Sequence, residues 1–331
     1  MTKEMFLNAL KNALHTLTPE EQEGAVTYFD EVLEDLMQEE GLTQEAAVAR
    51  MDKISTIAER ILEDRPAGAP ETTPTNDDEG LPGLKEITAR PQAVKHVNIR
   101  ARNMRIIVRV GNTEEIILRY PEENDTKFDF SLENGLLSLV QRPSDILNLF
   151  AFRIFYRQPY EIELTVPSDF AAAADIKTAN SPIRIDGIAF WGALTAATSN
   201  GNIKVENVSA QDMQITTSNA SLVVTNIASR SDIVLKSSNG RVTATHAESE
   251  KTLRITTSNS HIECAKCRAV DFTFATSNAR ISAVLPDQMT DYAVTSRTSN
   301  GSNSLPTQYD GGPKRLQATT SNGSIDIQFE G

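Results

Sequence analysis

The sequence predicts a mainly β protein, a parallel β-helix or β-solenoid, with a small all-α domain at its N-terminus. A Thr-Ser-Asn triplet or a near-copy of it recurs, with successive Asn spacings of 20, 19, 20, 20, 19, 22 and 22 residues. Around each Asn, apolar residues alternate with polar ones, which is the period of a half-buried strand. A fixed repeat of this length is typical of a stacked solenoid. Right-handed coiling is the expected hand for parallel crossovers.

Each repeat is predicted to be two short strands joined at the Asn. Apolar residues stand three and five positions after it, as Ile203 and Val205 do after Asn200. Asn tolerates the left-handed backbone region, and stacked amides can hydrogen-bond from rung to rung. We favour this structural role over contact with a ligand. The predicted corner residues are Asn180, Asn200, Asn219, Asn239, Asn259, Asn278, Asn300 and Asn322.

The solenoid is expected to span residues 85–331, with less regular rungs at its start. Asn134-Gly135, followed by Leu137 and Leu139, is interpreted as an early rung corner. At the other end the repeat lengthens, and residues 302–312 are interpreted as a loop that protects the last strands. A bare end would instead invite pairing with a second copy.

Residues 1–65 predict a compact helical unit. Thr2, Thr18 and Thr43 each precede an apolar pattern of helical period and are expected to cap helices. Residues 66–84 are rich in Pro, Gly, Asn and Asp, which predicts a flexible linker.

The net charge of −13 is concentrated in the helical unit and the linker. Residues 1–84 hold six Lys and Arg against 19 Asp and Glu, and the rest of the chain is balanced. The absence of a basic stripe argues against a nucleic-acid partner. The acidic helix face has two interpretations, a solvated surface or a docking surface for a basic protein. Neither a membrane-spanning run nor a signal-peptide core is visible, which favours the cytoplasm, with attachment to a membrane or an outer-surface location left open.

The densest apolar and aromatic run of the chain lies at residues 146–156. It interrupts the repeat, so no stacked rung requires its burial. One interpretation is a loop that folds back onto the solenoid core. The other is an exposed patch for a protein partner, and the one place for contact with a membrane. As the candidate interaction patch it comprises Leu147, Leu149, Phe150, Phe152, Ile154, Phe155 and Tyr156.

Few residues suggest chemistry. Asp212, Asp232 and Asp271 each stand seven positions before an Asn, and such a column could hold Ca²⁺, although turn aspartates that bond the backbone are the favoured interpretation. Cys264 and Cys267 fall on inward positions and are interpreted as buried thiols. No catalytic or phosphate-binding motif is visible. We therefore expect no enzyme activity and no cofactor.

Two parts of the chain resemble known families. Phe6-Leu7, Leu10, Leu14, Tyr28-Phe29 and Ile57-Ala58 resemble the HAAS-type helical domain of bacterial proteins, which implies a link to regulatory or envelope-stress systems. Here Met51-Asp52-Lys53 replaces the Gly-Asp/Asn-Pro of that family. The Tyr160–Pro167 strand ahead of Asn-corner repeats resembles the bacterial β-repeat families labelled "putative adhesin", which implies surface binding.

The function that these observations favour is a non-catalytic scaffold or sensor. In this hypothesis the helical head docks a regulatory or envelope-associated protein, and the solenoid supplies a recognition or self-assembly surface. The first alternative is a cell-surface adhesin. The second is a carbohydrate-active enzyme, because some long β-solenoids cleave polysaccharides, but the clustered carboxylates that such a site needs are not evident.

Overall fold

The structure is a computed structural model that describes residues 1–19, 43–51, 53–63, 84–122, 127–142 and 161–331, with scattered residues between 22 and 37. The chain divides into two compact units. One contains residues 1–82, 122–127 and 142–159. The other contains residues 83–121, 128–141 and 160–331. The predicted linker, residues 66–84, lies outside the described residues except for Leu84.

The helical unit has the capped helices that its sequence indicates. Its described helices are α1 (Lys3–Ala13), α3 (Gln44–Ala49) and α4 (Ile54–Glu63). The hydroxyl oxygens of Thr2 and Thr43 each accept a hydrogen bond from the backbone N–H three residues later, at 3.3 Å. Phe6 packs edge-on against Phe29, with ring centroids 6.2 Å apart, in the middle of the small core. Among the described residues, no helix is both long enough and apolar enough to cross a membrane.

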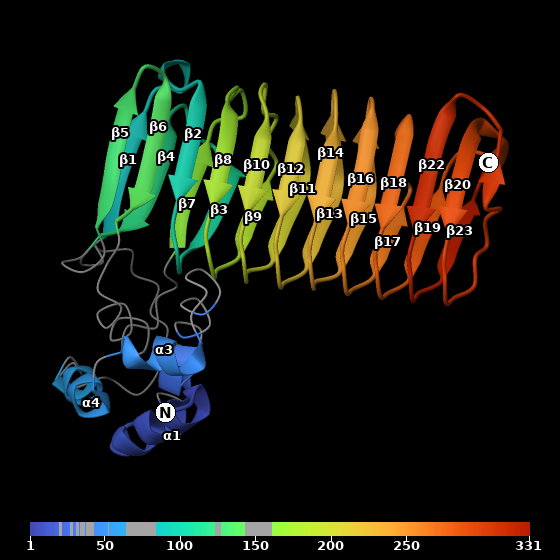
Figure 1. The fold of residues 1–331 in the computed structure, drawn as a ribbon. Helices are drawn as coiled ribbons and strands as arrows, with labels where there is room; N and C mark the ends of the chain where they lie inside the picture. Colours follow the sequence, from blue (N-terminus) through green and yellow to red (C-terminus); the bar gives the residue numbers. More distant parts are fainter. Residues whose placement is uncertain are drawn as a thin grey trace. The chain divides into compact units, whose positions relative to one another are not determined.

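The second unit is a solenoid of two facing sheets, which confirms the predicted fold class (Figure 1). The 11-stranded sheet runs, in spatial order, through β1 (Leu84–Ala89), β4 (Ile116–Pro121), β7 (Glu161–Val166), β3 (Arg105–Val110), β9 (Ile183–Asp186), β11 (Ile203–Ala210), β13 (Leu222–Ser229), β15 (Val242–Ser249), β17 (Ile262–Ala265), β19 (Ile281–Leu285) and β23 (Ile325–Phe329).

The 12-stranded sheet faces it across the core. Its order is β21 (Gln308–Tyr309), β20 (Tyr292–Arg297), β22 (Lys314–Thr319), β18 (Asp271–Ala275), β16 (Thr252–Thr256), β14 (Ile233–Lys236), β12 (Met213–Thr216), β10 (Leu194–Ala197), β8 (Ala173–Lys177), β2 (His96–Arg100), β6 (Leu136–Gln141) and β5 (Phe128–Glu133). Two short 3₁₀ helices, Pro91–Ala93 and Met289–Asp291, lie between strands.

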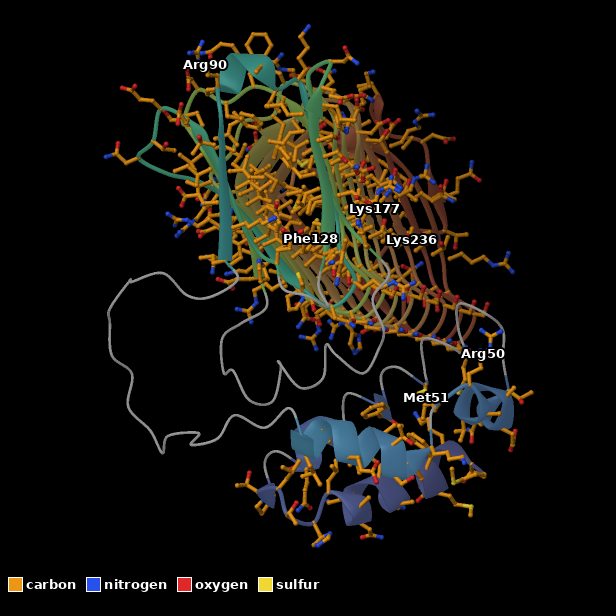
Figure 2. The ribbon with its side chains drawn as sticks, turned by 90° about the vertical axis from the view of Figure 1, so that its left-hand side faces the viewer. Arg50, Met51, Arg90, Phe128, Lys177 and Lys236 are labelled. Atoms are coloured by element: carbon orange, nitrogen blue, oxygen red, sulfur yellow. The ribbon has the colours of Figure 1, made fainter. Side chains whose placement is uncertain are left out.

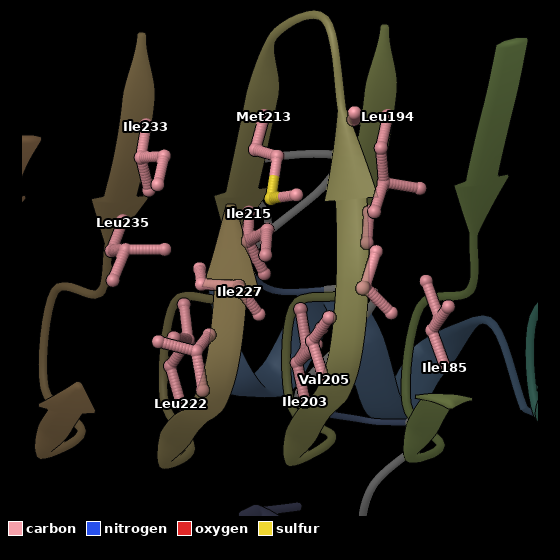
Figure 3. Packing of buried hydrophobic residues seen from close by; sticks show 14 of the residues in the cluster. Ile185, Leu194, Ile203, Val205, Met213, Ile215, Leu222, Ile227, Ile233 and Leu235 are labelled. Carbon is pink, nitrogen blue, oxygen red and sulfur yellow. The ribbon is translucent and has the colours of Figure 1, made fainter. Parts of the chain in front are cut away.

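The core consists of columns of apolar side chains that run along the stack. Ile203 pairs in register with Ile183 and Leu222, so one predicted inward position becomes one continuous column. Leu194, Met213 and Ile233 form a facing column from the other sheet (Figure 3). Burying each such side chain contributes roughly 1.5–3 kcal/mol, which offsets the entropy of ordering the rung. Polar and charged side chains occupy the outer faces, and the labelled Lys177 and Lys236 lie on the same side of the solenoid (Figure 2).

The start of the solenoid differs from the prediction. Asn134 and Gly135 both have positive φ and form the turn of the β5–β6 hairpin, whose strands pair antiparallel. The interpretation of this dipeptide as a rung corner was wrong, because Asn-Gly also suits a tight hairpin turn. Antiparallel pairs of β1 with β4 and of β4 with β7 cover the other sheet at this end. The parallel stack therefore stops here, and β1 and β5 are the edge strands of the two sheets.

The last rungs do not stack in sequence order. β22 lies between β18 and β20, and β23 pairs with β19, so the final rung in the sequence is not the final rung in space. β21 then pairs antiparallel with β20 at the outer edge. Ser304 donates its backbone N–H to Ile325 and accepts that of Ile327 through its hydroxyl oxygen, so residues 302–309 cover both sheets at this end.

Candidate functional site

The corner Asn side chains form one amide ladder along the solenoid. The Nδ2 of Asn200 donates to the Oδ1 of Asn180 at 2.7 Å, and the same bond, at 2.7–2.8 Å, recurs from rung to rung. Because of the exchanged rungs, the ladder runs in the order Asn103, Asn180, Asn200, Asn219, Asn239, Asn259, Asn278, Asn322 and Asn300. Asn103 was not among the predicted corners.

The Thr of every triplet except Thr298 is buried beneath the ladder. The Thr198 hydroxyl donates to the carbonyl of Ala179 at 2.9 Å, and the backbone N–H groups of Ser199 and Asn200 donate to the same carbonyl. Thr217, Ser237 and Thr257 repeat this bracing of the preceding rung. The triplet therefore satisfies buried polar groups of the corner by itself, as stable folding requires.

A second bend lies inside the long strands. Gly187, Asn207, Asn226, His246 and Lys266 occupy one position in successive rungs, and all have positive φ. The Nδ2 of Asn226 donates to the Oδ1 of Asn207 at 2.8 Å, so two of these corners are also joined by their side chains. After the bend, the chain of each rung continues for a few residues, which form a short face made of residues 188–191, 208–211, 227–230, 247–250 and 267–270.

A groove of about 420 Å³ runs over this short face and crosses its rungs. At one end stands Trp191, the single Trp of the chain, with 74% of its surface exposed. We call this surface the Trp191 groove. It is lined by Ala189, Phe190, Trp191, Ser209, Ala210, Ala228, Ser229, Arg230, Glu248, Ser249, Glu250 and Arg268.

The floor of the Trp191 groove is held by the backbone. Phe190 donates its N–H to the carbonyl of Ser209, Arg230 to Ala210, and Glu250 to Ser229, at 2.8–3.2 Å. Beneath them, the hydroxyl of Ser229 donates to the carbonyl of Gln211 at 2.8 Å. Side chains on such a floor keep their spacing when a ligand arrives, which lowers the ordering cost of binding.

The rim of the groove carries charges of both signs. Glu248 and Arg268 lie 4.0 Å apart, and each side chain is 61% exposed. An ion pair that exposed contributes little to stability. Both groups can therefore exchange this contact for one with a ligand at small cost.

The three aspartates of the predicted column make two kinds of hydrogen bond. The Oδ1 of Asp212 accepts the backbone N–H of Asp232 at 3.5 Å, and the Oδ1 of Asp232 accepts that of Thr252 at 3.2 Å. Asp271 instead accepts two hydrogen bonds from the Arg315 guanidinium, which hold the pKa of its carboxyl below the usual value. Within the described part of the chain, no three His, Cys, Asp or Glu side chains lie close enough together to hold a metal ion.

Cys264 and Cys267 are buried free thiols. Cys267 donates to the carbonyl of Ala265 at 3.4 Å. The hydrogen bond with Cys267, together with burial, raises the pKa of the Cys264 thiol well above its ordinary value. A protonated, buried thiol is a poor nucleophile and a poor metal ligand.

The predicted interaction patch, residues 146–156, lies outside the described residues. The strands on either side of it are described. The segment connects β6 to β7, the connection that a Thr-Ser-Asn corner makes in the regular rungs. It leaves β6 at Gln141, whose Oε1 accepts the backbone N–H of Arg102 at 2.8 Å, beside the first ladder residue, Asn103.

Sequence reasoning missed the Trp191 groove. Its residues stand nine to eleven positions after each corner Asn, beyond the alternating apolar pattern that revealed the strands. The signal available was the eleventh position, which carries Trp191, Gln211, Arg230, Glu250 and Val270 in successive repeats. A lone Trp in a column of otherwise polar or smaller residues marks an exposed aromatic ring.

Comparison with known proteins gives a family and a set of similar folds. The model of a family described as Toastrack DUF4097 matches residues 94–329, more than half of the chain. No curated protein matches.

Three solved structures are similar. A "putative adhesin" from Parabacteroides merdae has 12% identity and a TM-score of 0.41, and the match covers 75% of this chain and 97% of that one. A "putative adhesin" from Bacteroides fragilis has 14% identity, 75% and 98% coverage and a TM-score of 0.35. A "putative cell adhesion protein" from Clostridium sporogenes has 12% identity, 74% and 99% coverage and a TM-score of 0.23.

Proposed function

We propose that this chain, which belongs to the Toastrack DUF4097 family, is a non-catalytic recognition protein whose solenoid binds a ligand in the Trp191 groove. The observation that carries this proposal is the 74% exposure of Trp191. A Trp side chain buries roughly 150–250 Å² when it is covered. At about 25 cal/mol per Å², a partner that covers the ring gains several kcal/mol before the costs of association are subtracted.

The use of the carboxylates supports a non-catalytic role. Asp212, Asp232 and Asp271 bond the backbone or Arg315. A glycosidase needs two carboxyl groups that face one substrate bond, one of them with a raised pKa. In the described chain, the aspartates that came closest to this pattern are engaged in holding rungs together.

The helical unit is proposed to dock a protein partner. Its acidic charge suits a basic surface on that partner, and its resemblance to HAAS-type domains suggests a regulatory or envelope-associated protein. We propose a cytoplasmic location for the protein. Self-association through the solenoid ends is the less favoured arrangement, because the end strands β1, β5 and β21 pair antiparallel and do not continue the parallel stacking of the rungs.

Photo-cross-linking tests the groove directly. Benzoylphenylalanine is placed at Gln211, which belongs to the column of Trp191, or at Gln214, which is exposed on the 12-stranded sheet of the same rung. Illumination of cells that produce each variant should give an adduct at Gln211 and none at Gln214, because benzophenone inserts into C–H bonds of any molecule that covers it. The same adducts at both positions, or none at Gln211, would contradict recognition through the groove.

A further inference from the structure

We propose that the ligand of the Trp191 groove is a neutral, linear, β-linked oligosaccharide that lies along the solenoid axis and stacks one sugar on Trp191. This inference rests on the proposed function, since it names the chemical class that the groove binds. Three properties of the groove favour this class over others: its charge balance, the kind of contact its surface offers, and its period.

The charges of the groove cancel. Arg230 and Arg268 stand on the rim together with Glu248 and Glu250. Anionic polysaccharides and nucleic acids need an excess of positive charge, and a basic peptide needs an excess of negative charge. A neutral ligand needs no net charge on the groove in order to bind. Its hydroxyl groups find both hydrogen-bond donors and acceptors within one surface.

A ligand in the groove would contact side chains and not free backbone groups. A peptide that adds a strand to a sheet requires free backbone N–H and C=O groups. In the groove floor these groups already bond from rung to rung, as in the bonds of Phe190 to Ser209 and of Arg230 to Ala210. The floor is small, with Ala189, Ser209 and Ala228 on one outward column, so it lacks the deep apolar pocket that anchors a protein hot spot.

A hexose suits these side chains. Each face of its ring has C–H groups that stack on an indole, whereas its rim carries hydroxyls in pairs. Trp191 supplies the exposed aromatic face, and Gln211, Arg230 and Glu250 follow in the same column with planar polar groups that bond paired hydroxyls.

The groove also repeats at the step of the ligand. Ser209 pairs in register with Ala228, and Ala228 with Glu248, so equivalent positions recur at the strand spacing of about 4.8 Å. One sugar of an extended β-linked chain advances by about the same distance. An α-linked glucan coils instead and loses register with the rungs.

Fluorescence titration of the full chain tests the proposal, because Trp191 is its single Trp. Cellohexaose should shift the Trp191 emission to shorter wavelength, and affinity should rise with length from cellobiose to cellopentaose. Maltohexaose and an oligogalacturonate of equal length should bind at least tenfold more weakly. Equal responses to cellohexaose and maltohexaose would overturn the match of period, and no response to cellohexaose would overturn the ligand class.

Calorimetry with variants separates the groove from other surfaces. W191A should weaken cellohexaose binding at least tenfold, and Q211A should weaken it measurably, whereas Q214A should leave it unchanged. Unchanged binding to W191A would overturn the proposal. If Gln211 cross-links to a protein in cells and cellohexaose gives no response, the ligand class is wrong while recognition through the groove stands. If position 211 gives no cross-link in cells and cellohexaose gives no response, both proposals fail.

Discussion

Every residue of the Thr-Ser-Asn triplet takes part in the hydrogen bonds of the corner. At Thr198 the hydroxyl and the following Ser and Asn backbone N–H groups donate to one carbonyl of the preceding rung, and the Asn amide joins the ladder. An interior amide such as that of Asn239 donates to one neighbour and accepts from the other. Asn300, at the end of the ladder, donates to Asn322, and no ladder residue of the described chain donates to its Oδ1.

This difference predicts unequal stability losses. N239A should lower the free energy of unfolding by about 1–2 kcal/mol. The substitution removes two side-chain hydrogen bonds and leaves the amides of Asn219 and Asn259 each without one partner. N300A should cost about 0.5–1 kcal/mol, since one bond is lost. Urea unfolding of N239A and N300A measures the two losses of unfolding free energy. Equal losses would show that the amides do not act as a continuous ladder.

The hydrogen bonds of the Gly N–H groups at the corners predict an order of deamidation. Asn200, Asn239, Asn300 and Asn322 all precede Gly, and deamidation requires the Gly nitrogen to attack the Asn Cγ and expel ammonia. The backbone N–H groups of Gly201 and Gly240 donate to the hydroxyls of Thr198 and Ser237, which restrains the attacking nitrogen. Peptide mapping after incubation at mildly alkaline pH should find Asn300 deamidated before Asn200 and Asn239. Faster loss at an interior position would contradict this order.

At the residue scale the sequence located most of the ladder, because the triplet itself carries the corner chemistry. Asn103 escaped detection because it follows Ala101 and Arg102 in place of Thr and Ser, 77 residues before its partner Asn180. Asn134 was misassigned because a hairpin turn and a rung corner both favour Asn before Gly.

In several rungs the corner turn depends on a glycine after the Asn. A Cβ added to Gly240 would lie 1.6 Å from the carbonyl oxygen of Ala220 in the preceding rung. The G240A substitution should therefore destabilise the solenoid by about 2 kcal/mol or more, since rung and carbonyl must separate. A220G, at the equivalent position of the preceding rung, should cost only about 0.5–1 kcal/mol in backbone entropy. Thermal unfolding of G240A and A220G distinguishes a packing clash from a loss of backbone entropy. Similar losses of stability in the two variants would contradict the close approach of position 240 to the Ala220 carbonyl oxygen.

The exchanged rungs at the end of the solenoid are joined by charged pairs. Arg315 of β22 bonds Asp271 of β18, and Lys314 donates to Asp287 at 2.7 Å. The stacking order could not be read from the sequence, because every rung presents the same inward columns and the same corner. The longer spacing of the last two repeats was the one visible sign, and it indicated a loop without indicating an exchange.

The Asp271–Arg315 pair predicts an acid dependence. The bonds from Arg315 lower the folded-state pKa of Asp271, so the pair stabilises the fold above the unfolded-state value of about 4. That stability is lost as the pH falls through the lower folded-state pKa. The difference in unfolding free energy between the native chain and D271N should therefore shrink below about pH 4. A difference that is constant with pH would contradict the pairing, and R315Q should add no further loss to D271N.

At the scale of the whole molecule, the fold was predictable because one period governs most of the chain. The Trp191 groove was not, because its residues come from separate rungs and become neighbours only when the rungs stack in register. The aromatic run at residues 146–156 drew attention in the sequence by its density alone. It lies outside the described residues and stays a predicted patch, whereas the groove has a backbone-braced floor and an exposed ring.

The central claim is that a ligand covers the Trp191 groove in the cell, and hydroxyl-radical oxidation measures it most directly. Trp191 would be oxidised in the purified chain and in cells that produce it, with Leu136, 39% exposed on β6, as the internal reference. If a ligand covers the groove, Trp191 should be protected several-fold in cells relative to the purified chain, while Leu136 is oxidised equally in both. Equal oxidation of Trp191 in the two settings would contradict recognition through this groove.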